Sequence, residues 1–301
     1  MINIYGFSAI GTFLASSFRL SGYETALFSN SIRATEGLYH INCNSTLLGD
    51  HLLSIPEINY NYRSISLNII CSTCSGIDCY LEHIQYMVPG IRIIMLLQNG
   101  IIPISFNINA CNTNEKINLI RATIGYTSCI LESNKLVHIN RNLPLLSMSV
   151  NSFSLLSDAG FAKALQNNFR TDLLPNDEFV IWKKLVKSGP HFLFGLLDYY
   201  PSIGFQDVNS RSMLLIWFEE YFNISKLICP EIIDNKEIFK ATLESLEQNK
   251  IINSATQRFI KNYDTREFIS LVSEPYKIGV SLGLKSPSIK HAIDTFNQLT
   301  L

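Results

Sequence analysis

The chain opens with a strand-like run that leads directly into a glycine-containing turn and a helix-like segment. The run MINIY precedes GFSAIG at residues 6–11, and apolar residues then recur at helical spacing until Gly22. Residues 24–29, ETALFS, have the composition of a second strand. A strand, a helix and a strand within about 30 residues predict a βαβ unit, the start of an α/β domain with a parallel sheet.

The turn GFSAIG is similar to the dinucleotide-binding fingerprint G-x-G-x-x-G with its second glycine replaced. In that fingerprint the first glycine permits the bend, the second admits the pyrophosphate, and the third allows close helix–strand packing. Ser8 occupies the second position, where its hydroxyl can donate a hydrogen bond to a phosphate. The residues alone support a nucleotide turn and a structural turn equally. The candidate phosphate-binding residues are Gly6, Phe7, Ser8, Ala9, Ile10 and Gly11.

The second strand ends without a carboxylate. Enzymes that use NAD place Asp or Glu there to hold the ribose hydroxyls, whereas this chain has neutral donors followed by an arginine. The pattern favours NADP(H), with Ser29, Asn30 and Arg33 near the 2′-phosphate. A solvated loop position for Arg33 explains the pattern equally well.

The remaining sequence changes character along its length. Strand-like runs at 66–71 and 91–97 flank a helical segment at 77–86, and residues 119–150 contain short β-rich runs. From residue 153 onward helical periodicity dominates, in segments 153–166, 177–200, 206–225, 235–249, 251–283 and 287–299. We therefore expect an α/β domain over residues 1–174 and an all-α domain over residues 175–301.

Composition excludes several classes of protein. The 301 residues carry a net charge of -1 without acidic or basic blocks, which argues against a nucleic-acid or membrane-surface partner. No uncharged apolar run reaches about 18 residues, and the opening segment lacks the features of a signal peptide. The seven cysteines, including the CxxC at Cys71 and Cys74, show no regular metal-binding or disulfide spacing. We expect a reduced, cytoplasmic protein without a bound metal.

Five ordered landmarks extend almost from end to end of the chain. They are MINIYGFSAIG at 1–11, MLLQNGI at 95–101, ATIGYTSCILESNKLVHIN at 122–140, IWKKL at 181–185 and REFISLVSEPYKIGVSLGLKSP at 266–287. In this order and spacing they resemble the ketopantoate reductase (2-dehydropantoate 2-reductase) family, of which the chain looks like a divergent member. The resemblance implies an N-terminal Rossmann-type domain, an all-α C-terminal domain and an active site in the cleft between them. It also implies NADPH-dependent reduction of 2-dehydropantoate to pantoate, a step toward pantothenate and coenzyme A.

The resemblance assigns catalytic roles to three residues. Lys184 in IWKKL matches the family's catalytic lysine, which donates a proton to the alkoxide formed by hydride transfer; burial suits a lysine to this role by lowering its pKa. Asn99 matches an asparagine that contacts the cofactor or orients the lysine. Glu267 matches a glutamate linked to the lysine and the substrate. Lys183 and Lys187 are the nearest competitors for the lysine's role.

Simpler explanations exist for each of these residues. Asn99 and Gly100 have the composition of an ordinary turn, and Lys184 that of a solvated lysine on a helix surface. Arg266 replaces a family threonine, so it can form a local surface ion pair with Glu267.

Other positions depart from the family pattern. Ser72 replaces a lysine at the end of a family strand, and we expect it to contact the cofactor. Ser188 and Phe192 replace two asparagines that follow the catalytic lysine, and Ala255 replaces the substrate serine. The expected substrate-binding residues are Lys184, Ser188, His191, Ser254 and Glu267. A core position explains His191 at least as well.

These departures leave two further functions open. The chain can be a reductase of a different 2-oxo acid, or a dinucleotide-binding sensor or scaffold without catalysis. The expected partner is a small-molecule 2-oxo acid, and the expected assembly is a monomer or a homodimer.

Overall fold

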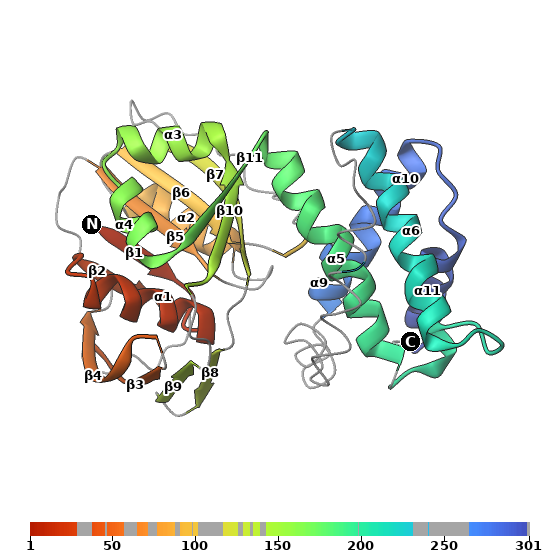
Figure 1. The fold of residues 1–301 in the computed structure, drawn as a ribbon, viewed down its shortest axis with the longest axis horizontal. Helices are drawn as coiled ribbons and strands as arrows, with labels where there is room; N and C mark the ends of the chain where they lie inside the picture. The colour runs from red at the N-terminus through yellow and green to blue at the C-terminus, as the bar shows by residue number, and fades with distance from the viewer. Residues whose placement is uncertain are drawn as a thin grey trace. The chain divides into compact units, whose positions relative to one another are not determined.

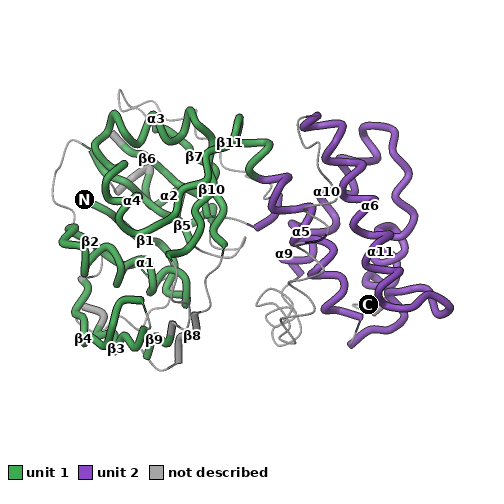
Figure 2. The backbone as a smooth tube through the Cα atoms, in the orientation of Figure 1, with its two compact units in different colours: residues 1–98, 104–180 green, residues 99–103, 181–301 purple. Residues whose placement is uncertain are grey.

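A computed structural model describes most of the chain in two compact units (Figure 2). The described residues are 1–28, 38–45, 47–56, 65–71, 77–87, 91–97, 99–101, 117–125, 129–132, 135–138, 143–197, 199–230, 240 and 265–299. Unit 1 contains residues 1–98 and 104–180, and unit 2 contains residues 99–103 and 181–301. The division by contacts thus falls a few residues after the boundary at 174/175, and the functional roles expected for the two halves stay predictions.

A seven-stranded sheet forms the framework of unit 1 (Figure 1). Its spatial order is β11-β10-β7-β6-β5-β1-β2. The strands are β1 (Ile2–Tyr5), β2 (Thr25–Phe28), β5 (Ile65–Ile70), β6 (Ile91–Leu97), β7 (Ile117–Gly125), β10 (Leu145–Ser149) and β11 (Arg170–Leu174). Within this sheet, the neighbouring strands β2, β1, β5, β6 and β7 all pair in parallel, whereas β10 is antiparallel to β7. Since β2 and β5 lie on opposite sides of β1, the carboxyl end of β1 is a topological switch point, where α/β sheets bind ligands.

Helix α1 (Ala9–Leu20) is covered by protein on both sides. A second sheet, of order β4-β3-β9-β8, lies beside it in Figure 1, and one core cluster joins Phe13 of α1, Ile4 of β1 and Ile41 of β3. All residues from Gly11 to Phe18 are buried, because a helix between two sheets has no solvent face. The strands of this sheet are β3 (Leu38–Ser45), β4 (Gly49–Pro56), β8 (Cys129–Glu132) and β9 (Lys135–His138).

Three further helices lie entirely within unit 1, namely α2 (Ile77–Met87), α3 (Val150–Asp158) and α4 (Ala162–Asn168). The prediction of one helix over 153–166 is wrong, because Gly160 adopts φ of 80° between α3 and α4. A left-handed glycine directly after a helix is a common C-terminal stop.

All regular secondary structure in the described residues of unit 2 is helical. Its elements are α5 (Asp177–Leu197, which begins in unit 1), η3 (Pro201–Ile203), α6 (Ser210–Ile228), α9 (Thr265–Phe268), the π-helical η4 (Ile269–Ser273), α10 (Glu274–Ser281) and α11 (Pro287–Leu299). The predicted helix at 235–249 lies outside the described residues, apart from residue 240. The predicted fold class, an α/β Rossmann-type domain followed by an all-α domain, is confirmed. Among the described helices, none has both the length and the hydrophobicity needed to cross a bilayer.

Candidate functional site

The turn after β1 requires glycine at both ends. Gly6 adopts φ of 117°, a backbone conformation that side-chain-bearing residues rarely adopt. A Cβ atom on Gly11 would collide with the carbonyl oxygen of Gly6. The two glycines therefore allow a sharp bend and a close packing of helix on strand, as the fingerprint requires, and their contact with a dinucleotide stays a prediction.

Ser8 is the N-cap of α1. Its hydroxyl oxygen accepts a hydrogen bond from the Gly11 N–H at 3.2 Å, and the hydroxyl donates to the Cys71 carbonyl at 3.3 Å. A serine hydroxyl has one hydrogen to donate, and here that hydrogen links the turn to the end of β5. Contact between Ser8 and a pyrophosphate stays a prediction.

Three strands end together at this turn. The Gly6 N–H donates to the Phe28 carbonyl at the end of β2, and the Cys71 N–H donates to the Tyr5 carbonyl at the end of β1. Ala9 and Ile10 begin α1, so their N–H groups have no partner within the helix. Such groups at a helix N-terminus bind phosphate, which makes the switch point a suitable place for a dinucleotide. Phe7, Ala9 and Ile10 are all partly buried.

Four residues predicted to contact the cofactor lie outside the described part of the chain. They are Ser29, Asn30, Arg33 and Ser72. The expected preference for NADP(H), which depends on the first three, therefore stays a prediction.

The segment carrying Asn99 belongs to unit 2 (Figure 2). The Ile101 N–H donates to the Ser270 carbonyl at 2.9 Å. A Cβ atom on Gly100 would lie 2.6 Å from that same carbonyl oxygen, so only glycine allows this approach. Asn99 itself is exposed. The Asn-Gly sequence therefore places an exposed amide beside the π-helical turn.

The π-helical turn directly follows Glu267. Wider π-helical turns interrupt the regular backbone ladder and occur often at functional sites. Two of its carbonyls accept bonds from other segments: Ser270 from Ile101, and Leu271 from the Tyr221 hydroxyl at 2.5 Å. Glu267 is only 6% exposed. The turn therefore fixes the Asn99 segment and α6 to the helix that carries this buried carboxylate.

Helix α5 packs against the same region. The ring of Phe192 contacts that of Phe268, the residue after Glu267, with centroids 6.3 Å apart. A Cβ atom on Gly189 would collide with the ring of Tyr221. Asn99, Lys184 and Glu267 thus belong to one unit, on segments joined by these contacts.

One face of α5 gathers basic and polar residues. At 3.6 residues per turn, Lys184, Lys187, Ser188 and His191 fall within an arc of about 100°, and all four are partly buried. Burial, with the charge of Lys187 as a smaller cause, lowers the pKa of Lys184 to about 8. Burial also lowers the pKa of Lys187. Lys184 therefore titrates in the range useful for a proton donor at neutral pH.

His191 is in electrostatic contact with both lysines. Burial, followed by the charges of Lys187 and Lys184, lowers its pKa to about 4. The imidazole is therefore neutral at pH 7 and is suited to hydrogen bonding rather than to carrying charge. Ser188 lies on the same face, and the roles predicted for both residues stay predictions.

Three other positions from the comparison with the family remain to be placed. Phe192 is completely buried, and it contacts Phe268, which stacks on Phe296 at 4.1 Å. This position is a core position, so the asparagine expected there from the family has no polar equivalent in this chain. Ser254 and Ala255 lie outside the described residues.

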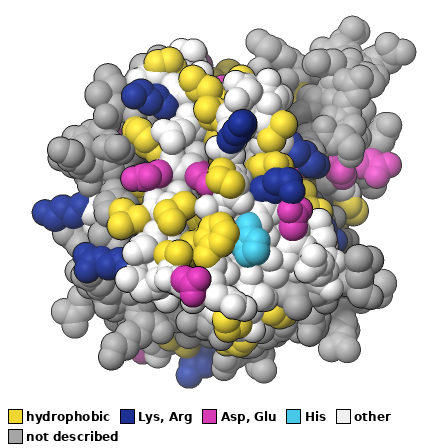
Figure 3. Space-filling model, turned by 90° about the vertical axis from the view of Figure 1, so that its right-hand side faces the viewer, with side chains coloured by type: hydrophobic (Ala, Val, Ile, Leu, Met, Phe, Trp, Pro, Cys, Tyr) yellow, Lys and Arg dark blue, Asp and Glu magenta, His cyan; other side chains and the backbone are white. Residues whose placement is uncertain are grey.

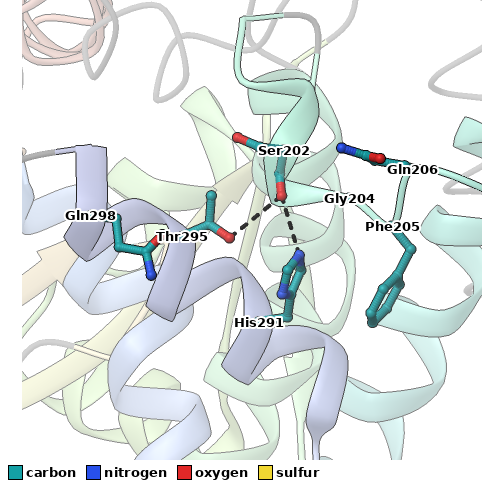
Figure 4. A pocket seen from close by; sticks show the side chains of 7 residues that line it. All are labelled: Ser202, Gly204, Phe205, Gln206, His291, Thr295 and Gln298. Atoms are coloured by element: carbon teal, nitrogen blue, oxygen red, sulfur yellow. Dashed lines mark hydrogen bonds between the residues drawn. The ribbon is translucent and has the colours of Figure 1, made fainter.

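A pocket of about 380 Å³ lies elsewhere in unit 2, between η3 and α11 (Figure 4). It is lined by Ser202, Gly204, Phe205, Gln206, His291, Thr295 and Gln298. The Ser202 carbonyl accepts bonds from His291 Nε2 at 3.2 Å and from the Thr295 hydroxyl at 3.4 Å. None of the predicted site residues lines it, and no Lys, Arg, Asp or Glu is among the described residues that line it. The pocket is therefore a poor match for an anionic substrate.

The side of the molecule shown in Figure 3 carries hydrophobic, basic and acidic side chains without separation into large areas of one kind. Hydrophobic side chains lie among separate basic and acidic ones, and the described part of this face has no continuous basic area. Exposed hydrophobic residues of unit 2 include Phe205, Val280 and Leu282. Scattered exposure of this kind is normal for a protein surface.

The described residues contain no group of three or more His, Cys, Asp or Glu side chains that could hold a metal ion. Cys43, Cys71, Cys79 and Cys229 are free thiols. Burial raises the pKa of Cys71, so this thiol stays protonated and is a poor nucleophile. Cys74 lies outside the described residues.

Two features of this region were missed in the sequence. Nothing in REFISLVSEP indicates a π-helical turn, because the turn depends on partners from distant segments. The common face of Lys184, Lys187 and His191 follows an i, i+3, i+7 pattern in the sequence, but that pattern does not distinguish a second basic residue of the site from a competitor for the role of Lys184.

Comparisons with solved structures identify the fold. No protein-family model matches the sequence, and a search of curated proteins finds no match. A dimeric ketopantoate reductase from Staphylococcus aureus has a TM-score of 0.72 at 16% identity, over 98% of this chain and 97% of that chain. A ketopantoate reductase from Ralstonia eutropha has a TM-score of 0.72 at 14% identity, over 97% of each chain. D-mandelate dehydrogenase with NADH and anilino(oxo)acetate has a TM-score of 0.73 at 14% identity, over 100% of each chain. This chain therefore has the fold of ketopantoate reductases and of D-mandelate dehydrogenase over nearly its whole length.

Proposed function

We propose that this protein is an NADPH-dependent reductase of 2-oxo acids, with 2-dehydropantoate as the first substrate to test. The observation that carries the proposal is the position of Lys184: a partly buried lysine whose pKa lies near 8, in the same unit as Asn99 and the buried Glu267. The fold supports it, because the similar solved structures include reductases and dehydrogenases of this substrate class.

The proposed chemistry uses two parts of the chain. Gly6, the Ala9 and Ile10 amides and Gly11 hold the pyrophosphate of the dinucleotide at the switch point of the sheet. The bound cofactor supplies the hydride to the keto carbon. Lys184 donates a proton to the developing alkoxide, and Glu267 and Asn99 orient the lysine and the substrate. The described residues of the turn fit a dinucleotide. Because the sequence after β2 has neutral donors and an arginine in place of a carboxylate, Ser29, Asn30 and Arg33 are proposed to select NADP(H).

A second candidate is reduction of a different 2-oxo acid. The observation that favours it is Phe192, which is a core residue at a position where the ketopantoate reductase family has an asparagine. Loss of that amide removes a polar group from the proposed substrate region. The likeness to D-mandelate dehydrogenase makes phenylglyoxylate, the oxo acid that corresponds to mandelate, the natural second substrate.

The experiment follows NADPH oxidation with 2-dehydropantoate and with phenylglyoxylate, for the wild type and Lys184→Met. We expect turnover by the wild type and a loss of at least about 100-fold in Lys184→Met, the usual scale for a general acid, with NADPH binding retained. Equal turnover by the variant contradicts the role of Lys184. NADPH binding without turnover of any oxo acid identifies a sensor or scaffold instead. The proposed assembly is a homodimer, and the proposed location is the cytoplasm.

A further inference from the structure

Lys187 is a partly buried cation without a counter-ion among the described residues. Two other lysines of unit 2 show the contrast, because Lys277 pairs with Glu274 and Lys290 pairs with Asp294, each at 2.7 Å. Those two pairs are exposed on at least one side and are ordinary surface ion pairs. Lys187 has neither an ion pair nor a hydrogen bond within the described part of the chain.

The titration of these lysines reflects the same difference. The hydrogen bond and charge of Asp294 raise the pKa of Lys290, whereas burial lowers the pKa of Lys187. A lowered pKa means that the folded protein disfavours the charged form of Lys187, as expected where no anion compensates for its partial removal from water.

The neighbours of Lys187 increase this cost. Lys184 lies three residues earlier and His191 four residues later, and the Lys187 charge lowers the pKa of both. Residues at these spacings have Cβ atoms about 5–6 Å apart on a helix surface. Two like charges one turn apart on a partly buried face repel each other, and an anion bound beside Lys187 would offset the effect of that repulsion on Lys187.

The substrate class supplies such an anion. A 2-oxo acid has its carboxylate bonded directly to the keto carbon, so a molecule whose keto oxygen meets Lys184 must place its carboxylate within a few ångströms. Lys187 has a flexible four-carbon stem and three N–H donors, which suit it to reach a carboxylate beside the Lys184 ammonium. His191 is neutral at pH 7 and can add one N–H donor.

We propose that Lys187, assisted by His191, binds the carboxylate of the 2-oxo acid substrate and so sets the specificity of the site for acids. This inference rests on the proposed function for the identity of the ligand. It gives the face of α5 two different tasks: Lys184 acts on the keto oxygen, and Lys187 holds the carboxylate. The carboxylate also compensates for the repulsion between the two lysines, so substrate binding stabilises the protonated form of the donor.

The test compares an acid with its neutral ester. Anilino(oxo)acetate and its methyl ester are titrated calorimetrically into the NADP⁺-saturated wild type, Lys187→Met, Lys187→Arg and Lys226→Met. Lys226 is an exposed lysine near the end of α6 and serves as the matched control. We expect Lys187→Met to weaken binding of the acid by roughly 10- to 100-fold, the range for a hydrogen bond to a charged group. Binding of the ester is expected to stay unchanged, Lys187→Arg to retain most of the acid affinity, and Lys226→Met to match the wild type.

Three results overturn the inference. Equal weakening of the acid and the ester shows that Lys187 is only structural, and equal affinities for the two in the wild type show that no carboxylate site exists. Weaker NADPH binding with unchanged acid binding assigns Lys187 to a cofactor phosphate. Unfolding is not expected to obscure the test, because methionine removes an unpaired, partly buried charge and should leave the melting temperature of Lys187→Met at or above that of the wild type.

Binding and turnover separate this inference from the proposed function. If the wild type binds the acid through Lys187 but reduces no 2-oxo acid, the proposed function fails and the carboxylate site stands. If the wild type reduces 2-oxo acids and Lys187→Met prefers the acid over the ester as strongly as the wild type does, the proposed function stands. Only the proposal that Lys187 binds the carboxylate is then refuted.

Discussion

The pH dependence of turnover is the most specific consequence of the environment of Lys184. A general acid must be protonated to act, and the pKa of Lys184 is about 8. The protonated fraction is therefore about 0.9 at pH 7 and about 0.1 at pH 9. We expect kcat/KM for a 2-oxo acid to be level below about pH 7 and to fall about tenfold per pH unit above about pH 8.

The fall in kcat/KM above about pH 8 is the descending limb of the pH profile, and replacement of Lys187 should move this limb to higher pH. The pKa of Lys184 falls from 10.5 to about 8, and burial contributes more than the charge of Lys187. The charge of Lys187 is the smaller of the two causes, so its removal should raise the pKa of Lys184 while the larger effect of burial remains. In Lys187→Met, which keeps the side-chain bulk and removes the charge, we therefore expect the fall in kcat/KM to begin at a higher pH than in the wild type, but still below the ordinary lysine value of 10.5.

The assay is NADPH oxidation from about pH 6 to about pH 10, since kcat/KM reports the free enzyme. Lys183→Met serves as the control for lysine identity and should leave the limb where it is in the wild type. A limb that moves to lower pH in Lys187→Met refutes the electrostatic reasoning. Loss of the limb in Lys183→Met refutes the assignment of the acid to Lys184.

Substitutions at Gly100, Ser8 and Glu220 test three further parts of the structure. Gly100→Ala places a Cβ atom 2.6 Å from the Ser270 carbonyl oxygen, so we expect a stability loss of about 1–3 kcal/mol and a lower kcat/KM. The control Gly125→Ala has its nearest contact at 4.0 Å and should be tolerated. Equal melting temperatures for the two variants would contradict this expectation. Ser8→Ala removes the cap of α1 and should cost about 0.5–2 kcal/mol, and Ser8→Gly only a few tenths. Because the hydroxyl is engaged within the protein, Ser8→Gly should bind NADPH at least as tightly as the wild type, and weaker binding in a calorimetric titration refutes that. Glu220→Gln weakens two bonds, from the Ser288 and Ile289 N–H groups at 2.9 and 2.8 Å, and should lower the unfolding free energy in urea by roughly 1 kcal/mol with NADPH affinity unchanged.

The opening of the chain was predictable because its local signals agree with the fold. MINIY, the glycine turn and the periodic segment after it correspond to β1, a switch-point turn and α1. The long apolar run at 91–97 corresponds to β6, a strand paired in parallel on both sides. The spacing of apolar residues in a strand or a helix indicates which of its faces is buried. The fold class, an α/β domain followed by an all-α domain, could therefore be predicted from the sequence.

Strands β8 and β9 lie within the β-rich runs expected at 119–150, whereas β3, β4 and β11 were not predicted, and β3 shows one reason. In β3 the buried residues Ile41, Cys43 and Ser45 alternate with exposed ones, as a half-buried strand requires. Asparagine is depleted in strands, and Asn42 and Asn44 concealed this alternation. A further signal was α1 itself, since a helix made of apolar and small residues on every side indicates a second covering layer.

The helical half of the site was predictable only in part. The resemblance selected Asn99, Lys184 and Glu267, which belong to one unit. It did not indicate what joins their segments, because the bonds from Ile101 and Tyr221 to the π-helical turn connect residues far apart in the chain. Their roles in catalysis stay predictions.

Isotope transfer tests the proposed reaction most directly. NADPH carrying deuterium at the transferable position of the nicotinamide is incubated with 2-dehydropantoate or phenylglyoxylate, and the product is examined by mass spectrometry and NMR. We predict a 2-hydroxy acid with one deuterium on the former keto carbon, formed by the wild type at a rate at least about 100-fold above that of Lys184→Met. Cofactor oxidation without deuterium in the product, or equal labelling by the variant, would contradict hydride transfer assisted by Lys184.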